Sequence, residues 1–161
     1  ENLTPDLVPS IETGMHLAVY KNRPDVNAVI HTHQVAASTF AVLNMPIPAL
    51  FDEQVFNLGI QVEVVPYGLS GSAELLFNVA KAVENRCNAF SLQNHGVLLL
   101  GVDLDEAERN VGLLEKTAAV YHNALVTNRA ISHLDPGVAD FIFTLLKDRQ
   151  EKEIARKQGA A

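Results

Sequence analysis

The chain has 161 residues, of which 48% are hydrophobic and 19% charged, a composition typical of one globular domain with a core of its own. A net charge of −7 at neutral pH argues against a nucleic-acid or anionic-membrane surface, and no apolar run approaches the roughly 20 residues that cross a bilayer. The single cysteine, Cys87, cannot form an internal disulfide and suits a reducing cytoplasm. We therefore expect a cytoplasmic protein with no nucleic-acid and no membrane partner.

Apolar periodicity and turn residues divide the chain into alternating helices and strands. Ser10 is the expected N-cap of the first helix, and Pro24 ends that helix because proline disfavours helical geometry at the residue before it. In chain order we expect a connection over 1–9, a helix over 11–21, a strand over 26–31, a helix over 34–43, an extended segment over 47–50, a strand over 60–65, a helix over 73–84, strands over 89–92 and 96–100, a helix over 104–126 and a last helix from 135. Residues 51–58 are ambiguous, with a helical turn that carries Asp52 and Glu53 as one interpretation.

The last helix leads into a charged tail over residues 147–161, which should either fray or lie on the surface. The chain contains no internal repeat and no low-complexity segment. Because strands alternate with helices, the sequence predicts an α/β protein or, more specifically, an α/β/α layered one.

The residues with the clearest chemical meaning are two histidines at the end of the first predicted strand. His31 and His33 are two residues apart, so on a strand their imidazoles face the same side. His95 lies in a polar break between two apolar runs, and Glu12 lies upstream. Three imidazoles and a carboxylate make a candidate catalytic metal site with one position open for substrate. Taken singly, each has a plainer interpretation: His-x-His also occurs by chance, and a glutamate in a first helical turn usually serves the helix dipole.

Three other histidines have less specific interpretations. His16 shares a helix face with Glu12 and is interpreted as structural or as a partner of the site residues. His122 and His133 stand in polar surroundings and should be exposed. The run Ser70-Gly71-Ser72 should form a turn and a helix cap, with an anion site as the alternative.

Seven short motifs then add up to a resemblance. They are Pro9-Ser10-Ile11-Glu12, Met15-His16-Leu17-Ala18-Val19-Tyr20, Arg23-Pro24-Asp25, Ala28-Val29-Ile30-His31-Thr32-His33, Ile47-Pro48-Ala49, Val65-Pro66-Tyr67 and Gln93-Asn94-His95-Gly96. In this order they resemble the class II aldolase/adducin family, from about residue 9 to residue 125. The resemblance implies a layered α/β/α fold with a central, largely antiparallel sheet flanked by helices. It also implies a carbon–carbon lyase of carbohydrate metabolism.

The resemblance implies a role for each of the four residues. His31, His33 and His95 would bind Zn²⁺, with Mn²⁺ or Co²⁺ as alternatives, and Glu12 would be the acid/base. A small, phosphorylated ketose would chelate the metal through its carbonyl and hydroxyl oxygens. Glu12 would remove a carbon-bound proton to leave a metal-stabilised enediolate, which adds to an aldehyde or, in reverse, arises by cleavage of the sugar.

Two departures from the family pattern leave the substrate open. In the aldolases the sugar phosphate is held by Gly-Asn and Thr/Ser-Gly loops upstream of the Pro-Ser-x-Glu motif, and nothing of that kind precedes Glu12 here. We therefore expect a single domain over 1–161 that lacks its N-terminal phosphate-binding portion, or a chain that binds phosphate in another way. The second departure is Asp52, at the position where the aldolases have a tyrosine that reaches a neighbouring subunit. Asp52 and Glu53 are accordingly the candidate proton donors.

The resemblance also implies a homotetramer with its active site at a subunit boundary. The crowding of apolar residues around Asp52 supports an interface there (Phe51, Val55, Phe56 and Leu58). The alternatives within the same fold are a ribulose-phosphate 4-epimerase, a sugar-acid phosphate decarboxylase and a dehydratase. The alternative of another class is an adducin-like, non-catalytic scaffold domain.

Overall fold

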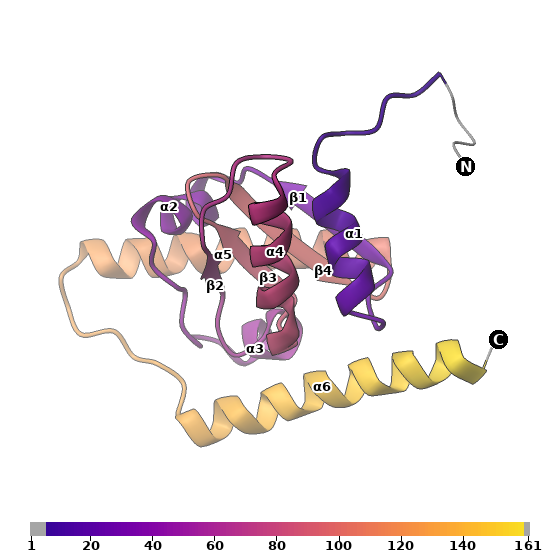
Figure 1. Cartoon of the computed structure of the whole chain (residues 1–161). Helices are drawn as coiled ribbons and strands as arrows, with labels where there is room; N and C mark the ends of the chain where they lie inside the picture. Colours follow the sequence, from indigo (N-terminus) through magenta and orange to yellow (C-terminus); the bar gives the residue numbers. More distant parts are fainter. Residues whose placement is uncertain (1–5, 160–161) are drawn as a thin grey trace.

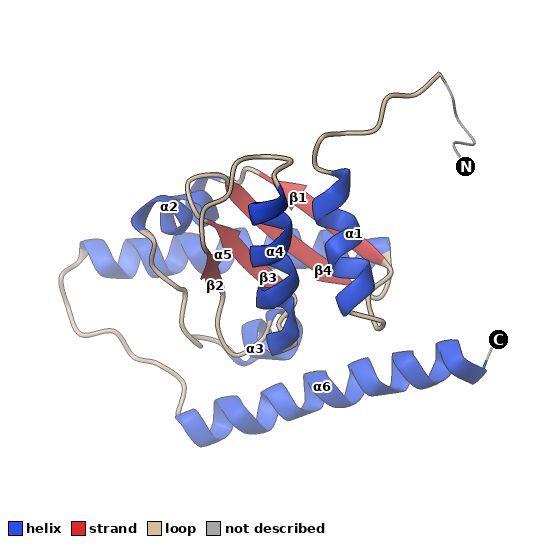
Figure 2. Ribbon diagram, viewed as in Figure 1, coloured by secondary structure: helices blue, strands red, loops and turns tan. Residues whose placement is uncertain are grey.

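A four-stranded sheet with helices on both faces forms the centre of the protein (Figures 1 and 2). The structure is a computed structural model that describes residues 6–159. Its elements are α1 (Thr13–Asn22), β1 (Ala28–Thr32), α2 (Val35–Leu43), α3 (Asp52–Leu58), β2 (Glu63–Val65), α4 (Ala73–Ala82), η1 (Val83–Asn85), β3 (Ala89–Leu92), β4 (Gly96–Gly101), α5 (Leu104–Val126) and α6 (Pro136–Gly159). The expectation of a layered α/β/α fold is confirmed. Among the helices of residues 6–159, none is both long enough and apolar enough to cross a membrane.

The strand order is β1-β4-β3-β2, and two of the three pairings are antiparallel. Only β2 and β3 run parallel. With these directions the end of β1, the end of β3 and the start of β4 meet at one edge of the sheet. The predicted, largely antiparallel sheet is therefore confirmed, and this edge is where the histidines lie.

Alternating residues of the central strands face two separate cores. Leu98 and Leu100 pack with α1 and α4, whereas Val97 and Leu99 pack with α2 and α5. All four are buried, because β4 lies between neighbours on both sides and helices on both faces. The chain thus has a rigid central strand directly after the turn that carries His95.

Some boundaries differ from the prediction for identifiable reasons. Helix α1 begins at Thr13, and Glu12, not Ser10, holds the N-cap position without a side-chain cap bond. Ser10 instead forms the turn before the helix: its Oγ accepts from the Glu12 N–H at 3.2 Å. The strand predicted over 60–65 is shorter, because Val62 pairs outside the sheet with Ile47 as an isolated bridge.

Helix α3 resolves the ambiguous stretch over 51–58. Val55 and Leu58 are fully buried, so the interpretation of these two as exposed interface residues is wrong. Phe51 and Phe56 are half-buried, and the Arg149 guanidinium lies 4.5 Å from the centroid of the Phe56 ring. The apolar spacing that suggested an interface is largely explained by packing within the chain.

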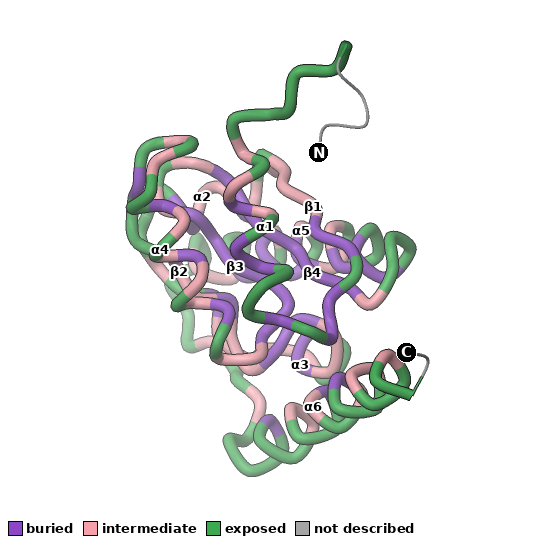
Figure 3. The backbone as a smooth tube through the Cα atoms, turned by 45° about the vertical axis from the view of Figure 1, so that its right-hand side comes forward, coloured by how far each residue is buried: buried purple, intermediate pink, exposed green. Residues whose placement is uncertain are grey.

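The charged end of the chain is helical. Helix α6 continues to Gly159 instead of fraying, and Figure 3 shows that it is mostly exposed. Three of its residues are buried, Ala139, Leu146 and Gln150. Gln150 is 2% exposed, and its amide donates to the Arg86 carbonyl at 2.9 Å and accepts from Arg86 Nε at 3.0 Å. The sequence left open whether residues 147–161 fray or lie on the surface, and up to residue 159 they form a helix on the surface.

A buried ion pair holds the bend between α1 and β1. Arg23 and Asp25 are almost inaccessible and lie 2.7 Å apart, and Arg23 also donates to the Cys87 carbonyl and to Asn88 Oδ1. Arg23 has three partners and Asp25 accepts two hydrogen bonds from Arg23, so both buried charges are compensated. The bend therefore fixes the start of β1, the strand that leads to His31.

Candidate metal centre

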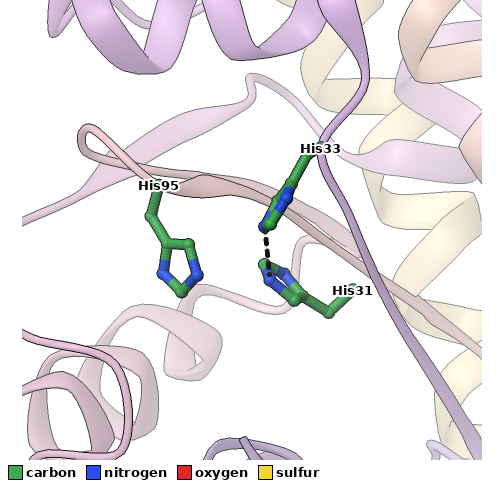
Figure 4. Close-up of side chains that lie close together, drawn as sticks. All are labelled: His31, His33 and His95. Atoms are coloured by element: carbon green, nitrogen blue, oxygen red, sulfur yellow. Dashed lines mark hydrogen bonds between the residues drawn. The ribbon is translucent and has the colours of Figure 1, made fainter.

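Three histidines converge at the edge of the sheet described above. His31 is in β1, His33 directly follows that strand, and His95 lies in the turn between β3 and β4. Their possible ligand nitrogens all lie within 4.8 Å of one another, and Figure 4 shows the rings turned toward a common centre. The structure thus brings together the three imidazoles that the sequence singled out.

The spacing suits one small cation. The Nε2 atoms of His31 and His33 are 3.1 Å apart (Figure 4), and the His95 ring centroid is 4.8 Å from that of His31 and 5.5 Å from that of His33. In a tetrahedral site with metal–nitrogen bonds of about 2.0–2.1 Å, ligand nitrogens lie about 3.3 Å apart. Small rotations of the imidazoles would reach that geometry, with a fourth position left for another ligand.

A backbone contact orients His31. Its Nδ1 lies 2.9 Å from the Val97 carbonyl oxygen, which can only accept, so Nδ1 carries the hydrogen and the Nε2 lone pair faces the centre. Burial lowers the pKa of His31, as do the neighbouring His95 and His33, while the Val97 carbonyl and Glu12 oppose this shift. The lowered pKa favours the neutral imidazole, which is the form that binds metals.

Gly96 gives the rings room to approach. A Cβ at this position would overlap the His33 ring and the Thr32 carbonyl oxygen. On the other side of the cluster, Ser70 Oγ lies 3.4 Å from His95 Nε2. Gly96 was not singled out as functional from the sequence, although the His95-Gly96 motif contained the relevant signal. Ser70 was considered only as part of a turn and cap or of an anion site, not as a neighbour of His95. The predicted cap is also present, since Ser72 Oγ accepts from the Leu75 N–H at 3.2 Å.

Glu12 lies close enough to the cluster to act electrostatically on His31. Its Oε2 is buried and has no hydrogen-bond partner within the described residues. Together with Ser10, Thr13 and His16 it lines a cavity of about 260 Å³. A buried carboxylate oxygen without a donor is costly unless something else is bound, so this atom fits a site for a cation or for a substrate proton.

The structure places His16 beside Glu12. It is half-buried, and burial lowers its pKa while the Glu12 carboxylate opposes the shift. It therefore neighbours the carboxylate rather than the histidine cluster. His122 and His133 are exposed, as predicted.

Asp52 and Glu53 are not brought to the histidines by the fold of one chain. Both are exposed in the first turn of α3, and Glu53 Oε2 pairs with Lys116 Nζ at 3.0 Å. Figure 2 shows α3 below the sheet, between the sheet and α6, whereas the turn between β3 and β4 lies at the upper end of the sheet. Within one chain these two carboxylates therefore do not belong to the histidine cluster.

Comparisons with known proteins agree with this geometry. The family described as "Class II Aldolase and Adducin N-terminal domain" matches residues 1–122. The chain is 36% identical to an L-fuculose phosphate aldolase of Escherichia coli O157:H7, over 83% of this chain and 60% of that protein. It is 33% identical to an L-fuculose phosphate aldolase of Methanococcus maripaludis, over 74% of this chain and 63% of that protein.

Solved structures agree as well. An L-fuculose 1-phosphate aldolase superposes with a TM-score of 0.80 at 33% identity, over 87% of this chain and 65% of that one. YgbL of Escherichia coli, described as a candidate aldolase/epimerase/decarboxylase, superposes with a TM-score of 0.74 at 30% identity, over 84% of this chain and 66% of that one. The chain spans about 60% of the length of the curated Escherichia coli aldolases that it matches.

Proposed function

Since this chain belongs to the class II aldolase and adducin family, we propose that it is the metal-binding part of an aldolase that cleaves or forms a C–C bond in a small ketose phosphate. The observation that carries the proposal is the convergence of three imidazoles beside a buried carboxylate oxygen that has no partner among residues 6–159. An adducin-like scaffold has no need of either feature. The proposal takes its reaction class from the relatives and its residues from the site.

The cofactor in this proposal is a divalent metal held by His31, His33 and His95. Zn²⁺ is the first candidate because it commonly binds three imidazoles with one open position, and Mn²⁺ and Co²⁺ are the alternatives. When bound, such an ion would act as a Lewis acid on the substrate carbonyl and stabilise the negative charge that develops there. Neutral imidazoles leave more of its positive charge available than thiolates would.

The protein's own residues would handle the proton. Glu12 Oε2, which no donor of the described part of the chain reaches, would accept the carbon-bound proton and return it in the reverse direction. The Val97 carbonyl would hold His31 in the tautomer that binds the metal. The cavity beside Glu12 and Ser10 would admit the reacting end of the substrate.

A cleavage assay tests the reaction class. The full-length protein that contains this sequence, loaded with Zn²⁺, Mn²⁺ or Co²⁺, should release an aldehyde from at least one ketose 1-phosphate. L-fuculose 1-phosphate and 5-deoxyribulose 1-phosphate come first in the panel, because relatives are named for them. A chelator should abolish the activity and added metal should restore it. The proposal fails if metal-loaded protein releases no aldehyde from any member.

The same assay separates the alternatives. An epimerase would convert a pentulose phosphate into its epimer without net cleavage, a decarboxylase would release CO₂ from a sugar-acid phosphate, and a dehydratase would release water from its substrate. A scaffold would purify without stoichiometric metal. Only release of an aldehyde supports the leading proposal.

The assembly in this proposal is a homotetramer in which Asp52 or Glu53 of one subunit completes the site of another. The placement of α3 supports it, because these carboxylates could reach a histidine cluster only from a second copy. Both are exposed, and Asp52 has no ion-pair partner among the described residues. Light scattering coupled to size exclusion measures the oligomeric state.

Mixing two inactive variants tests the shared site. His31→Ala removes one metal ligand and Asp52→Asn removes the proposed donor, so each homo-oligomer should be nearly inactive. In mixed tetramers about a quarter of the sites would combine an intact His31 with an intact Asp52 from a neighbour. Co-expression should therefore recover about that fraction of wild-type activity. No recovery in a confirmed mixed oligomer, or full activity of the Asp52→Asn protein, would contradict the shared site.

A further inference from the structure

We propose that Glu115, on α5, is a positioning residue for the metal centre, where it holds the turn that carries His33. The Glu115 carboxylate accepts two backbone hydrogen bonds at the start of α2, from the Ala36 N–H at 2.9 Å and from the Ala37 N–H at 3.0 Å. The inference rests on the metal site proposed above, and it concerns a residue outside the histidine cluster.

His33 needs such support because it lies outside regular structure. The strand before it ends at Thr32 and the helix after it begins at Val35, so only His33 and Gln34 connect the two. The direction of the His33 side chain therefore depends on how this two-residue connection is held at both ends. Its β1 end is fixed by the pairing of Thr32 with Val97, which leaves the α2 end to be explained.

The start of α2 has no cap of its own. The first N–H groups of a helix lack partners within it, and a side chain at the N-cap position normally accepts from one of them. Gln34 occupies that position but makes no cap bond; its amide donates instead to the Val111 carbonyl at 2.8 Å. Glu115 takes over this function from another helix, with both oxygens engaged. A carboxylate at this position is also favoured by the helix dipole.

Both connections lead to the same helix. Gln34 contacts α5 at Val111, and the start of α2 contacts α5 at Glu115, one turn further along. Between them, Leu114 of α5 is fully buried in the core that also contains Ala37 and Phe40 of α2. The connection that carries His33 is therefore held against helix α5, by apolar packing of α2 and by the hydrogen bonds of the Glu115 carboxylate.

The test compares metal affinity between Glu115 variants and a matched cap variant. Asp103 is the control, because its carboxylate caps α5 by accepting from the Glu106 N–H at 2.7 Å, at the other end of β4 from His95. We expect Glu115→Ala to weaken Co²⁺ and Zn²⁺ binding by roughly 10–100-fold, the usual effect of losing a group that orients a metal ligand. Asp103→Ala should leave both dissociation constants within about twofold of wild type.

Three measurements make the outcome clear. Chelator competition gives the dissociation constants, the visible spectrum of the Co²⁺ form reports the ligand geometry, and thermal unfolding of the metal-free chain reports the loss of each cap. Glu115→Gln keeps the size of the side chain but only one good acceptor, so it should weaken metal binding less than Glu115→Ala does. It replaces Glu115→Ala in the test if that variant does not fold.

Two results would overturn the inference while the metal site stands. One is a Glu115 variant that unfolds at lower temperature but keeps wild-type metal affinity and Co²⁺ spectrum. The other is an Asp103→Ala protein that loses as much affinity as Glu115→Ala. A wild-type protein that binds neither metal would overturn the metal site itself and this inference with it.

Discussion

His95→Ala should reduce the divalent metal bound to the purified protein from about one equivalent per chain to almost none. His95 supplies one of three imidazoles that the fold brings within 4.8 Å of one another, and two imidazoles alone hold such an ion much more weakly. The fold should survive, because His95 lies in a turn and its side chain makes one long hydrogen bond within residues 6–159, to Ser70 Oγ at 3.4 Å. Elemental analysis of the dialysed protein measures the metal content.

The control for this experiment is another histidine. His133 is exposed and has no part in the cluster, so His133→Ala should keep its metal. Circular dichroism should give the same helix content for both variants. Unchanged metal content in His95→Ala would show that the three imidazoles are not the site. His31→Ala provides a second variant, although it also removes the hydrogen bond to the Val97 carbonyl.

Glu12→Gln should lower kcat by about 10²–10⁴ while the metal stays bound, the usual contribution of a positioned general base. The amide keeps the shape of the side chain and cannot accept a carbon-bound proton. Stability should change little, because Glu12 holds the N-cap position of α1 without making a side-chain cap bond. The role assigned to Glu12 therefore predicts a loss of turnover without a loss of folding or metal.

Steady-state kinetics and metal analysis on the same preparation measure both quantities. Asp105→Asn is the control, since it makes the same change of a carboxylate to an amide at an exposed position near a helix start, in the first turn of α5. It should leave kcat unchanged. A Glu12→Gln protein with nearly normal kcat would move the role of the base elsewhere, with Asp52 and Glu53 as the first residues to examine.

Local patterns predicted most elements, and tertiary contacts explain where they failed. Helix α5 was predicted over its full extent, because a 23-residue amphipathic period leaves little ambiguity. The strand predicted over 60–65 was too long because the partner of Val62 is Ile47, a pairing that no local pattern encodes. The charged end of α6 looked like a tail because composition alone did not indicate that Gln150 meets Arg86 across 64 positions of sequence.

The site followed the same rule. His31 and His33 could be paired because a strand places alternate residues on one face, and the family motifs gave His95 and Glu12 their roles in the same candidate site. The contacts that position them were not predictable: Glu115 caps a helix 79 positions earlier in the sequence, and the carbonyl that orients His31 has no side-chain signature. Short-range periodicity identified the candidate ligands, whereas their support depends on the packed structure.

The polar contact of Gln150 has a consequence for how α6 can lie on the rest of the chain. A purely apolar seam would let a helix slide by one turn, about 5.4 Å, with little change in buried area. The Gln150 amide both donates to the Arg86 carbonyl and accepts from Arg86 Nε, and it reaches Asn88 Oδ1, the atom that also accepts from Arg23. A shift of one turn would break all three of these hydrogen bonds of the Gln150 amide. The network therefore selects a single register for α6 and couples its docking to the buried ion pair before β1.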